Sequence, residues 1–131
     1  MEIIVDIISF LMYNFLERVI NTMENVRWGT NEPIKCNDDY YGELSINAFG
    51  TYSCECGTNL TEEEVTNVLV NALKQYINNL SSVDVMNLSR DIDSKQIIDI
   101  ANHNELSTEF KNVIINIKLT TESKEKINES Y

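Results

Sequence analysis

The stretch that decides the fold is RWGTNEPIKCNDDYYGELSINAFGTYSCEC, residues 27–56. Its first part, residues 28–33, is rich in turn formers and holds the only proline of the chain, so no regular element should pass through it. Its last part alternates, because the even positions from Leu44 to Cys56 are apolar or small and the odd positions are mostly polar. A period of two residues predicts one long strand over residues 43–56 with one buried face.

Two glycines mark changes within this stretch. Gly42 ends a second turn, which begins at residues 37–39. Gly50 lies in the middle of the predicted strand, where a glycine indicates a bulge or a bend. Phe49, directly before it, is the exception to the alternation, since it is a large apolar residue at an odd position.

Length and composition favour one domain with a substantial core. The chain has 131 residues, 43% of them hydrophobic, and we take residues 1–131 as a single domain. It carries 10 basic against 21 acidic residues, a formal charge of −11, which argues against nucleic acid and anionic membrane surfaces as direct partners. Such an acidic surface either docks on a basic site of another protein or only keeps the protein soluble. Three cysteines, an odd number, fit a reducing compartment, so we expect a cytoplasmic protein.

Residues 1–21 are predicted to form an apolar helix. Glu2 and Asp6 are acidic where a secretory signal would be basic, and the longest uncharged run, residues 7–16, is too short to span a bilayer. An interfacial membrane helix usually carries several basic residues, but this segment has only Arg18, so packing on protein is favoured over peripheral contact with lipid. The alternative is a segment that is partly β, with a strand already under way at its end.

Two helices are predicted after the long strand. Thr61 and Glu64 form a capping box for the first, which runs to about residue 80. Asp93 caps the second, which ends near His103. The buried side of the first helix is an apolar stripe with helical spacing, made of Val65, Val68, Leu69, Ala72, Leu73, Tyr76, Ile77 and Leu80.

The C-terminal part predicts one more strand and an unfolded tail. Residues 112–119 alternate between polar and apolar side chains and should close the sheet. Residues 120–131 are charged and lack a convincing apolar face, so we expect them to fray.

No arrangement of residues in the sequence points to catalysis. Cys54 and Cys56 are the obvious metal candidates, with Cys36 and His103 as further ligands, but residues i and i+2 of a strand share one face, here the apolar one. We therefore expect the thiols in the core and His103 exposed at a helix end. The glycines are too scattered for a phosphate-binding loop. The sequence thus predicts no enzyme, no cofactor site and no metal site.

The motifs of the opening stretch resemble a known superfamily. The pattern WGT-x-x-PI, followed by Tyr-Gly and then by AFGTYS, is similar to the SPFH (band 7, prohibitin-homology) superfamily in its virion core protein-like bacterial branch. We take the residues that carry this resemblance as fold-motif and candidate partner-binding residues: Trp28, Gly29, Thr30, Pro33, Tyr41, Gly42, Phe49, Gly50 and Tyr52.

The resemblance implies an α+β fold, in which a curved antiparallel sheet packs against two or three helices. The apolar N-terminal helix then occupies residues 1–21, the SPFH-like core residues 22–119, and the frayed acidic tail residues 120–131. The family usually continues into a long helical region, so the resemblance describes a truncated member.

The function implied by the resemblance is a non-enzymatic scaffold or interaction module. It would self-associate as a homo-oligomer or bind a protein partner, such as an SPFH homologue. The alternative is a small acidic inhibitor of viral or mobile-element origin, anti-CRISPR-like, that occupies the basic nucleic-acid groove of a host protein. A phage structural protein is a third interpretation.

Overall fold

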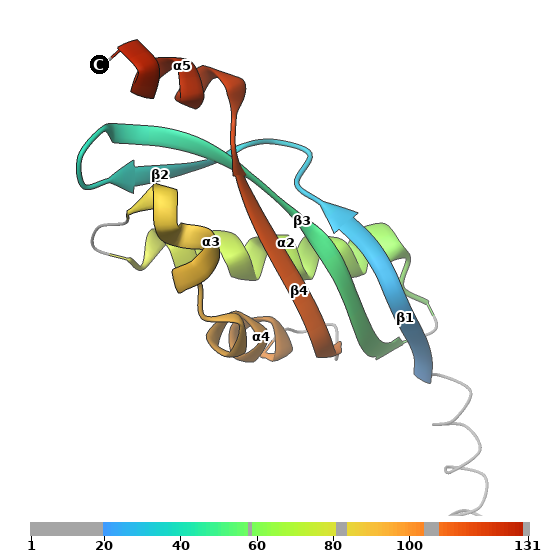
Figure 1. Ribbon diagram of the computed structural model, residues 1–131. Coiled ribbons are helices and arrows are strands. Elements are labelled where there is room, and N and C mark those ends of the chain that lie inside the picture. Colours follow the sequence, from blue (N-terminus) through green and yellow to red (C-terminus); the bar gives the residue numbers. More distant parts are fainter. Residues whose placement is uncertain (1–19, 58, 81–83, 104–107, 130–131) are drawn as a thin grey trace, which may run out of the picture.

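The computed structural model describes residues 20–57, 59–80, 84–103 and 108–129 (Figure 1). In these ranges the chain forms an open, four-stranded antiparallel sheet with four α-helices and one 3-10 turn, so the predicted α+β class is confirmed. The elements are, in chain order, β1 (Ile20–Gly29), β2 (Ile34–Asp38), β3 (Gly42–Gly57), α2 (Glu62–Asn78), η1 (Val85–Asn87), α3 (Leu88–Asp91), α4 (Ser94–Asn102), β4 (Glu109–Leu119) and α5 (Thr121–Glu129).

The long predicted strand, β3, is the centre of the sheet. β1 and β2 lie one after the other along one of its edges, with Gly29 opposite Phe49 and Ile34 opposite Ile46. β4 pairs along the other edge. The residues between β1 and β2 are therefore a short interruption in one continuous edge, and every other strand is paired with β3 (Figure 1).

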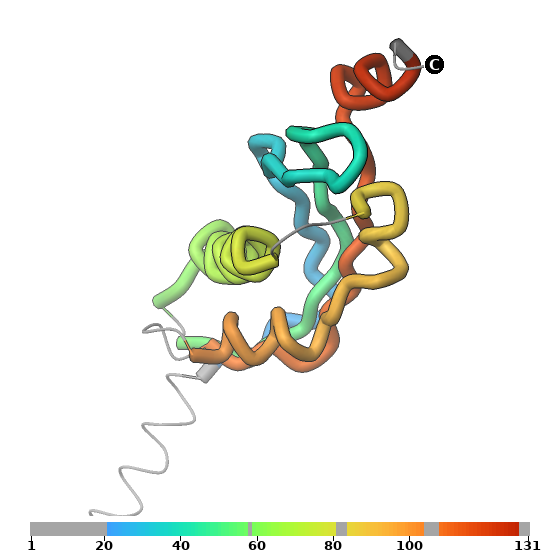
Figure 2. The backbone as a smooth tube through the Cα atoms, turned by 90° about the vertical axis from the view of Figure 1, so that its left-hand side faces the viewer, coloured from blue at the N-terminus to red at the C-terminus, as the bar shows by residue number. Residues whose placement is uncertain are grey.

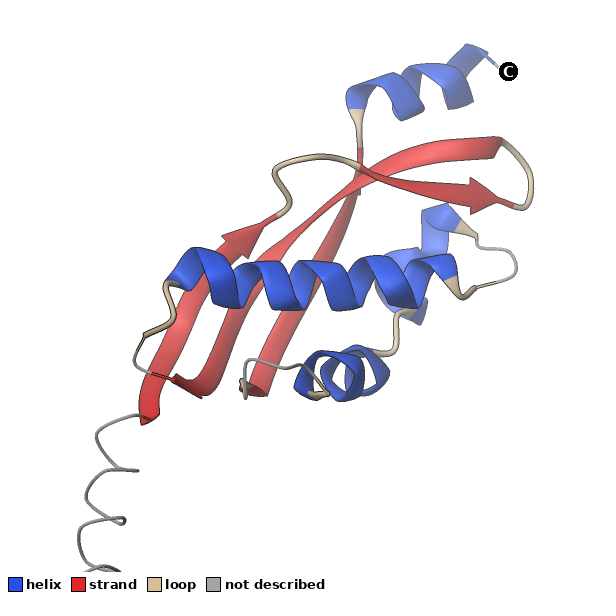
Figure 3. Ribbon diagram, turned by 180° about the vertical axis from the view of Figure 1, so that it is seen from behind, coloured by secondary structure: helices blue, strands red, loops and turns tan. Residues whose placement is uncertain are grey.

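The predicted alternation of β3 is confirmed by burial. Its even positions from Leu44 to Cys56 are buried, apart from Gly50, and α2 covers this face of the sheet (Figure 3). The capping box of α2 is also confirmed, because the Glu64 N–H donates to Thr61 Oγ1 at 3.2 Å and the Glu64 carboxylate accepts from the Thr61 backbone. The side of α2 that meets the sheet and α4 consists of Val65, Leu69, Ala72, Leu73, Tyr76 and Ile77.

Side chains from two helices cap the outer edge of β4. Ser89 Oγ in α3 accepts from the Ile117 N–H and donates to the Ile117 carbonyl, both at 3.1 Å. The Asn102 amide at the end of α4 does the same at Phe110, accepting from its N–H at 2.7 Å and donating to its carbonyl at 3.4 Å. Each side chain thus imitates a partner strand, which is one way to protect a sheet edge from pairing with another chain.

The structure corrects two expectations for the opening stretch, the loop at Trp28 and Gly29 and the bulge at Gly50. Trp28 and Gly29 do not belong to a loop but end β1, so the break is confined to residues 30–33. The register of β3 runs through Gly50 without a shift on either side, so there is no bulge at this glycine. The irregularities lie instead in β1 between Met23 and Val26, and in the β3–β4 pairing between Ser53 and Cys54.

The predicted fraying of residues 120–131 is also wrong for the described part of the tail, which forms α5. The Ser123 hydroxyl accepts from the Ser45 N–H at 2.7 Å, and the Thr120 N–H donates to the Ser45 carbonyl at 3.0 Å. Ser123 and Ile127 are buried one helical turn apart. The tail is anchored by one apolar residue and a set of polar bonds, which hydrophobic periodicity does not detect.

The helix predicted over residues 1–21 lies mostly outside the described residues. Ile20 and Asn21 already belong to β1, in agreement with the alternative that a strand begins at the end of this segment. Among the helices that the structure describes, none is both long and apolar enough to cross a lipid bilayer.

Candidate functional site

The motif residue Trp28 crosses the central strand at Gly50. The two residues are directly opposite in the β1–β3 pairing, and the Trp28 indole N–H donates to the carbonyl of Ile114 on β4 at 3.3 Å. A Cβ built on Gly50 would overlap that Ile114 carbonyl oxygen and lie 3.4 Å from the indole nitrogen. The absence of a side chain at Gly50 is therefore what lets the indole of β1 reach β4, and Trp28 itself is buried.

Thr30 fixes the start of the loop between β1 and β2. Its N–H donates to the Ala48 carbonyl at 2.9 Å, and its hydroxyl oxygen accepts from the Ala48 N–H at 3.1 Å. This reciprocal pair extends the β1–β3 ladder by one residue beyond Gly29. Pro33, the last residue before β2, is exposed.

Tyr52 anchors α2 to the sheet. Its ring is fully buried and stacks edge-on against Phe110 with the centroids 5.4 Å apart. Its hydroxyl bonds with Thr66 Oγ1 at 3.0 Å and donates to the Glu62 carbonyl at 3.4 Å, both in the first turns of α2. Burial raises the pKa of the Tyr52 phenol above its ordinary value, although the bond with Thr66 acts in the opposite direction.

Asp38 organises the turn that carries the motif residues Tyr41 and Gly42. Its carboxylate accepts from the N–H groups of Tyr40 and Tyr41, each at 2.8 Å, and from the Val85 N–H of η1 at 2.9 Å. Burial alone would raise the pKa of Asp38, but the three backbone hydrogen bonds outweigh it, so the pKa lies below its ordinary value. Gly42 closes the turn with φ of +74°, a conformation that favours glycine.

The three cysteines lie in the core, as predicted. Cys36, Cys54 and Cys56 are all buried and none forms a disulfide. Burial raises the pKa of Cys36 to about 11 and that of Cys54 to about 12, so both are protonated thiols near neutral pH, whereas nucleophiles and metal ligands are thiolates. His103 ends α4 as predicted and is exposed, with Nδ1 at 2.6 Å from the Asp99 carbonyl.

No described set of three or more His, Cys, Asp or Glu side chains is grouped so that it could hold a metal ion. Residues 20–57, 59–80, 84–103 and 108–129 therefore offer no candidate metal centre.

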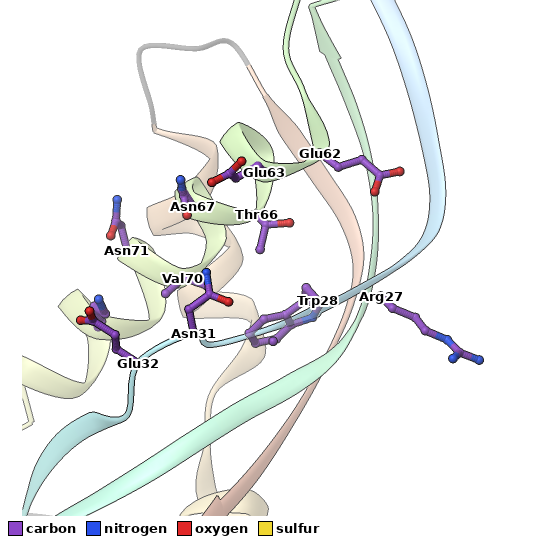
Figure 4. A pocket seen from close by; sticks show the side chains of 12 residues that line it. Arg27, Trp28, Asn31, Glu32, Glu62, Glu63, Thr66, Asn67, Val70 and Asn71 are labelled. Atoms are coloured by element: carbon purple, nitrogen blue, oxygen red, sulfur yellow. The ribbon is translucent and has the colours of Figure 1, made fainter.

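Above Trp28 the structure forms an open polar cleft of about 450 Å³, which we call the Trp28 cleft. One wall is the end of β1 with the following loop, and the other is the solvent-facing side of α2 (Figure 4). Trp28 and Asn31 project from the first wall toward α2, whereas Arg27 projects away from it (Figure 4). The polar residues that line the cleft are Arg27, Asn31, Glu32, Glu62, Glu63, Thr66, Asn67, Asn71 and Lys74.

On the opposite face of the sheet, the motif residue Phe49 is 46% exposed and Ile114 is 57% exposed. They are diagonal neighbours, because Phe49 pairs with Asn116 and Ile114 pairs with Thr51. α2 lies on the other side of the sheet (Figure 2). We call this surface the outer sheet patch and define it by Arg27, Asn47, Phe49, Thr51, Ile114, Asn116 and Lys118.

The structure separates the predicted motif residues into two groups. Trp28, Thr30, Gly42, Gly50 and Tyr52 build the fold, and Gly29, Pro33 and Tyr41 lie in or beside the same turns and strand ends. Phe49 faces solvent.

Sequence reasoning missed the cleft and the outer sheet patch as surfaces. Asn67 and Asn71, spaced four residues apart on the polar side of a predicted helix, were a signal for the cleft. Ile114 gave a weaker signal, an apolar residue out of phase with its strand.

Comparison with known proteins identifies the family to which these motifs belong. A model of the SPFH domain-Band 7 family matches residues 13–129. No curated protein and no solved structure matches the chain. The family match covers nearly the whole chain and includes every motif residue from Trp28 to Tyr52. The chain therefore belongs to the SPFH domain-Band 7 family, whose members serve generally as scaffolds or protein-interaction modules.

Proposed function

We propose that the protein is a non-enzymatic scaffold unit that self-associates through the outer sheet patch. The observation that carries this proposal is the exposure of Phe49 and Ile114 beside each other on a sheet face that no described helix covers. Contiguous exposed apolar surface is a feature of protein contact sites. The scaffold role of the family supports a protein as the partner.

The charge of this patch is compatible with a second copy as its partner. The chain has a formal charge of −11, so two copies repel each other over most orientations. The seven residues that define the patch include two basic side chains, Arg27 and Lys118, and no acidic one. The outer sheet patch therefore contributes no carboxylate to a contact between two copies. Buried thiols without disulfides agree with assembly in a reducing compartment such as the cytoplasm.

Sedimentation velocity of the full chain tests this proposal. Wild-type protein should sediment as an oligomer at micromolar concentration, and the variant Phe49→Gln/Ile114→Gln should sediment as a monomer. The matched control is Tyr40→Gln/Met86→Gln, which replaces two other exposed apolar side chains, 84% and 60% exposed, and should leave assembly unchanged. A wild-type monomer at every concentration, or equal loss in both variants, contradicts the proposal.

A second candidate function is an acidic inhibitor that occupies a basic groove of another protein. The feature that favours it is the charge of −11, together with three glutamates in the first turn of α2. Salt separates the two candidates. Higher ionic strength screens repulsion between acidic copies and should strengthen self-association, whereas it should weaken binding to a basic groove.

A further inference from the structure

We propose that the Trp28 cleft binds an extended peptide segment that carries basic side chains. The amides of Asn31, Asn67 and Asn71 line this cleft from both walls. None of the three makes a hydrogen bond within the part of the chain that the structure describes, so each retains one donor group and one acceptor group. A side-chain amide with both groups available can pair with a peptide N–H and C=O, as Asn102 already does at Phe110.

The spacing of the two helical amides suits an extended chain. Asn67 and Asn71 are one turn apart on α2, a rise of about 6 Å at 1.5 Å per residue. Alternate residues of an extended peptide are about 6.6–6.8 Å apart. Both amides can therefore pair with alternate peptide units on the same edge of a bound strand.

The length of the helical wall fixes the length of the segment. From Glu63 to Lys74 the helix rises by about 16 Å, which corresponds to roughly five residues of an extended peptide.

The charges of the cleft fix the chemistry of the segment. Glu32 and Glu63 line it, and no ion pair to a described residue neutralises their carboxylates, whereas the Glu62 side chain projects away from the asparagines (Figure 4). Lys74 is the opposing cation, since Arg27 points away from α2 (Figure 4). Lysine or arginine side chains on the peptide would meet two carboxylates, whereas acidic ones would be repelled. This site lies on the opposite side of the sheet from the outer sheet patch, so it does not depend on self-association.

Fluorescence of Trp28, the only tryptophan in the chain, gives a direct readout. The full chain is titrated with acetyl-Ala-Lys-Ala-Lys-Ala-amide, with its glutamate counterpart, and with the lysine peptide N-methylated at alternate residues. We expect a saturable change with the lysine peptide and at least tenfold weaker binding of the other two. No saturable response, or equal responses to the lysine and glutamate peptides, overturns the proposal.

Two variants locate the effect. The variant Asn67→Ala/Asn71→Ala should bind the lysine peptide at least tenfold more weakly than the wild type does. The urea midpoint of this variant should stay at or above that of the wild type, because alanine favours the helix. The matched control Gln75→Ala/Gln96→Ala removes two amides that lie outside this cleft and should bind as the wild type does. Unchanged binding in the asparagine variant overturns the assignment, and so does an equal loss in the control.

Discussion

Replacing Gly50 with alanine should destabilise the protein far more than a change of one methyl group usually does. The new Cβ would overlap the Ile114 carbonyl oxygen and lie 2.8 Å from the carbonyl carbon, and both atoms belong to the backbone of β4. Backbone cannot rotate away as a flexible side chain can. Either β4 moves away from β3, or the two strands lose their pairing at this point, and in both cases the Trp28 N–H loses its acceptor.

The magnitude follows from two contributions. Overpacking that forces a backbone shift costs about 1–3 kcal/mol. Loss of the Trp28–Ile114 hydrogen bond adds about 0.5–1.5 kcal/mol. Alanine also restricts the unfolded chain, which offsets at most about 1 kcal/mol. The free energy of unfolding should therefore fall by about 0.5–4.5 kcal/mol, taking these contributions together.

Urea unfolding followed by far-UV circular dichroism measures this difference. The matched control is Gly29→Ala, because a Cβ there would lie 3.7 Å from the Ala48 carbonyl oxygen and 3.8 Å from Phe49 Cβ, ordinary contact distances. That variant should stay within about 0.5 kcal/mol of the wild type. Equal urea midpoints for the two alanine variants would refute the close approach at Gly50. In a Trp28→Phe background the cost of the Gly50 change should shrink, since the indole bond is already absent.

Three further predictions concern Asp38, Tyr52 and the three buried thiols. Asp38→Asn should cost about 1.5–3 kcal/mol, because a charged acceptor of three backbone N–H groups is lost. The pKa of Asp38 is lowered in the folded protein, so the contribution of its carboxylate to stability is complete above about pH 4 and is lost as the pH falls through the folded pKa. Acid should therefore reduce the urea midpoint of the wild type more than that of the variant. Parallel plots of urea midpoint against pH for the two proteins would contradict this. Tyr52→Phe should lower the free energy of unfolding in urea by about 1–2 kcal/mol, while the edge-on stacking on Phe110 persists. The losses of stability from Tyr52→Phe and Thr66→Val should be less than additive in the double variant, because the two hydroxyls share one hydrogen bond. Full additivity would show that the hydroxyls do not interact. All three thiols should resist a disulfide reagent at pH 8 in the native protein and react in urea, and fast native labelling would contradict their burial.

Local patterns predicted much of this fold because they have local causes. The period-two run of β3 reflects burial on one face, and the capping box at Thr61 and Glu64 depends on four consecutive residues. Burial of the thiols followed from the same alternation. The antiparallel sheet was predicted from the motif resemblance, because the pattern of a single strand does not specify which strands pair with it.

Other features depend on contacts distant in sequence. The role of Gly50 is set by Ile114 and Trp28, so sequence reasoning predicted a bulge or a bend where the structure has a close approach. α5 is held by Ser123 against Ser45, a polar contact without periodicity. The Trp28 cleft brings loop residues beside a helix thirty or more positions away, as Asn31 faces Asn67, so its walls could not be joined from the sequence alone.

The association of copies through the outer sheet patch is tested most directly by photo-crosslinking from position 49. The full chain carrying p-benzoylphenylalanine in place of Phe49 is irradiated at micromolar concentration, and the same probe in place of Tyr40, 84% exposed, serves as the control. Position 49 should yield a covalent dimer whose crosslinked peptides map to a second copy, and position 40 should yield none. A protein that stays monomeric on irradiation from position 49, or that crosslinks equally from both positions, contradicts a scaffold built through this face.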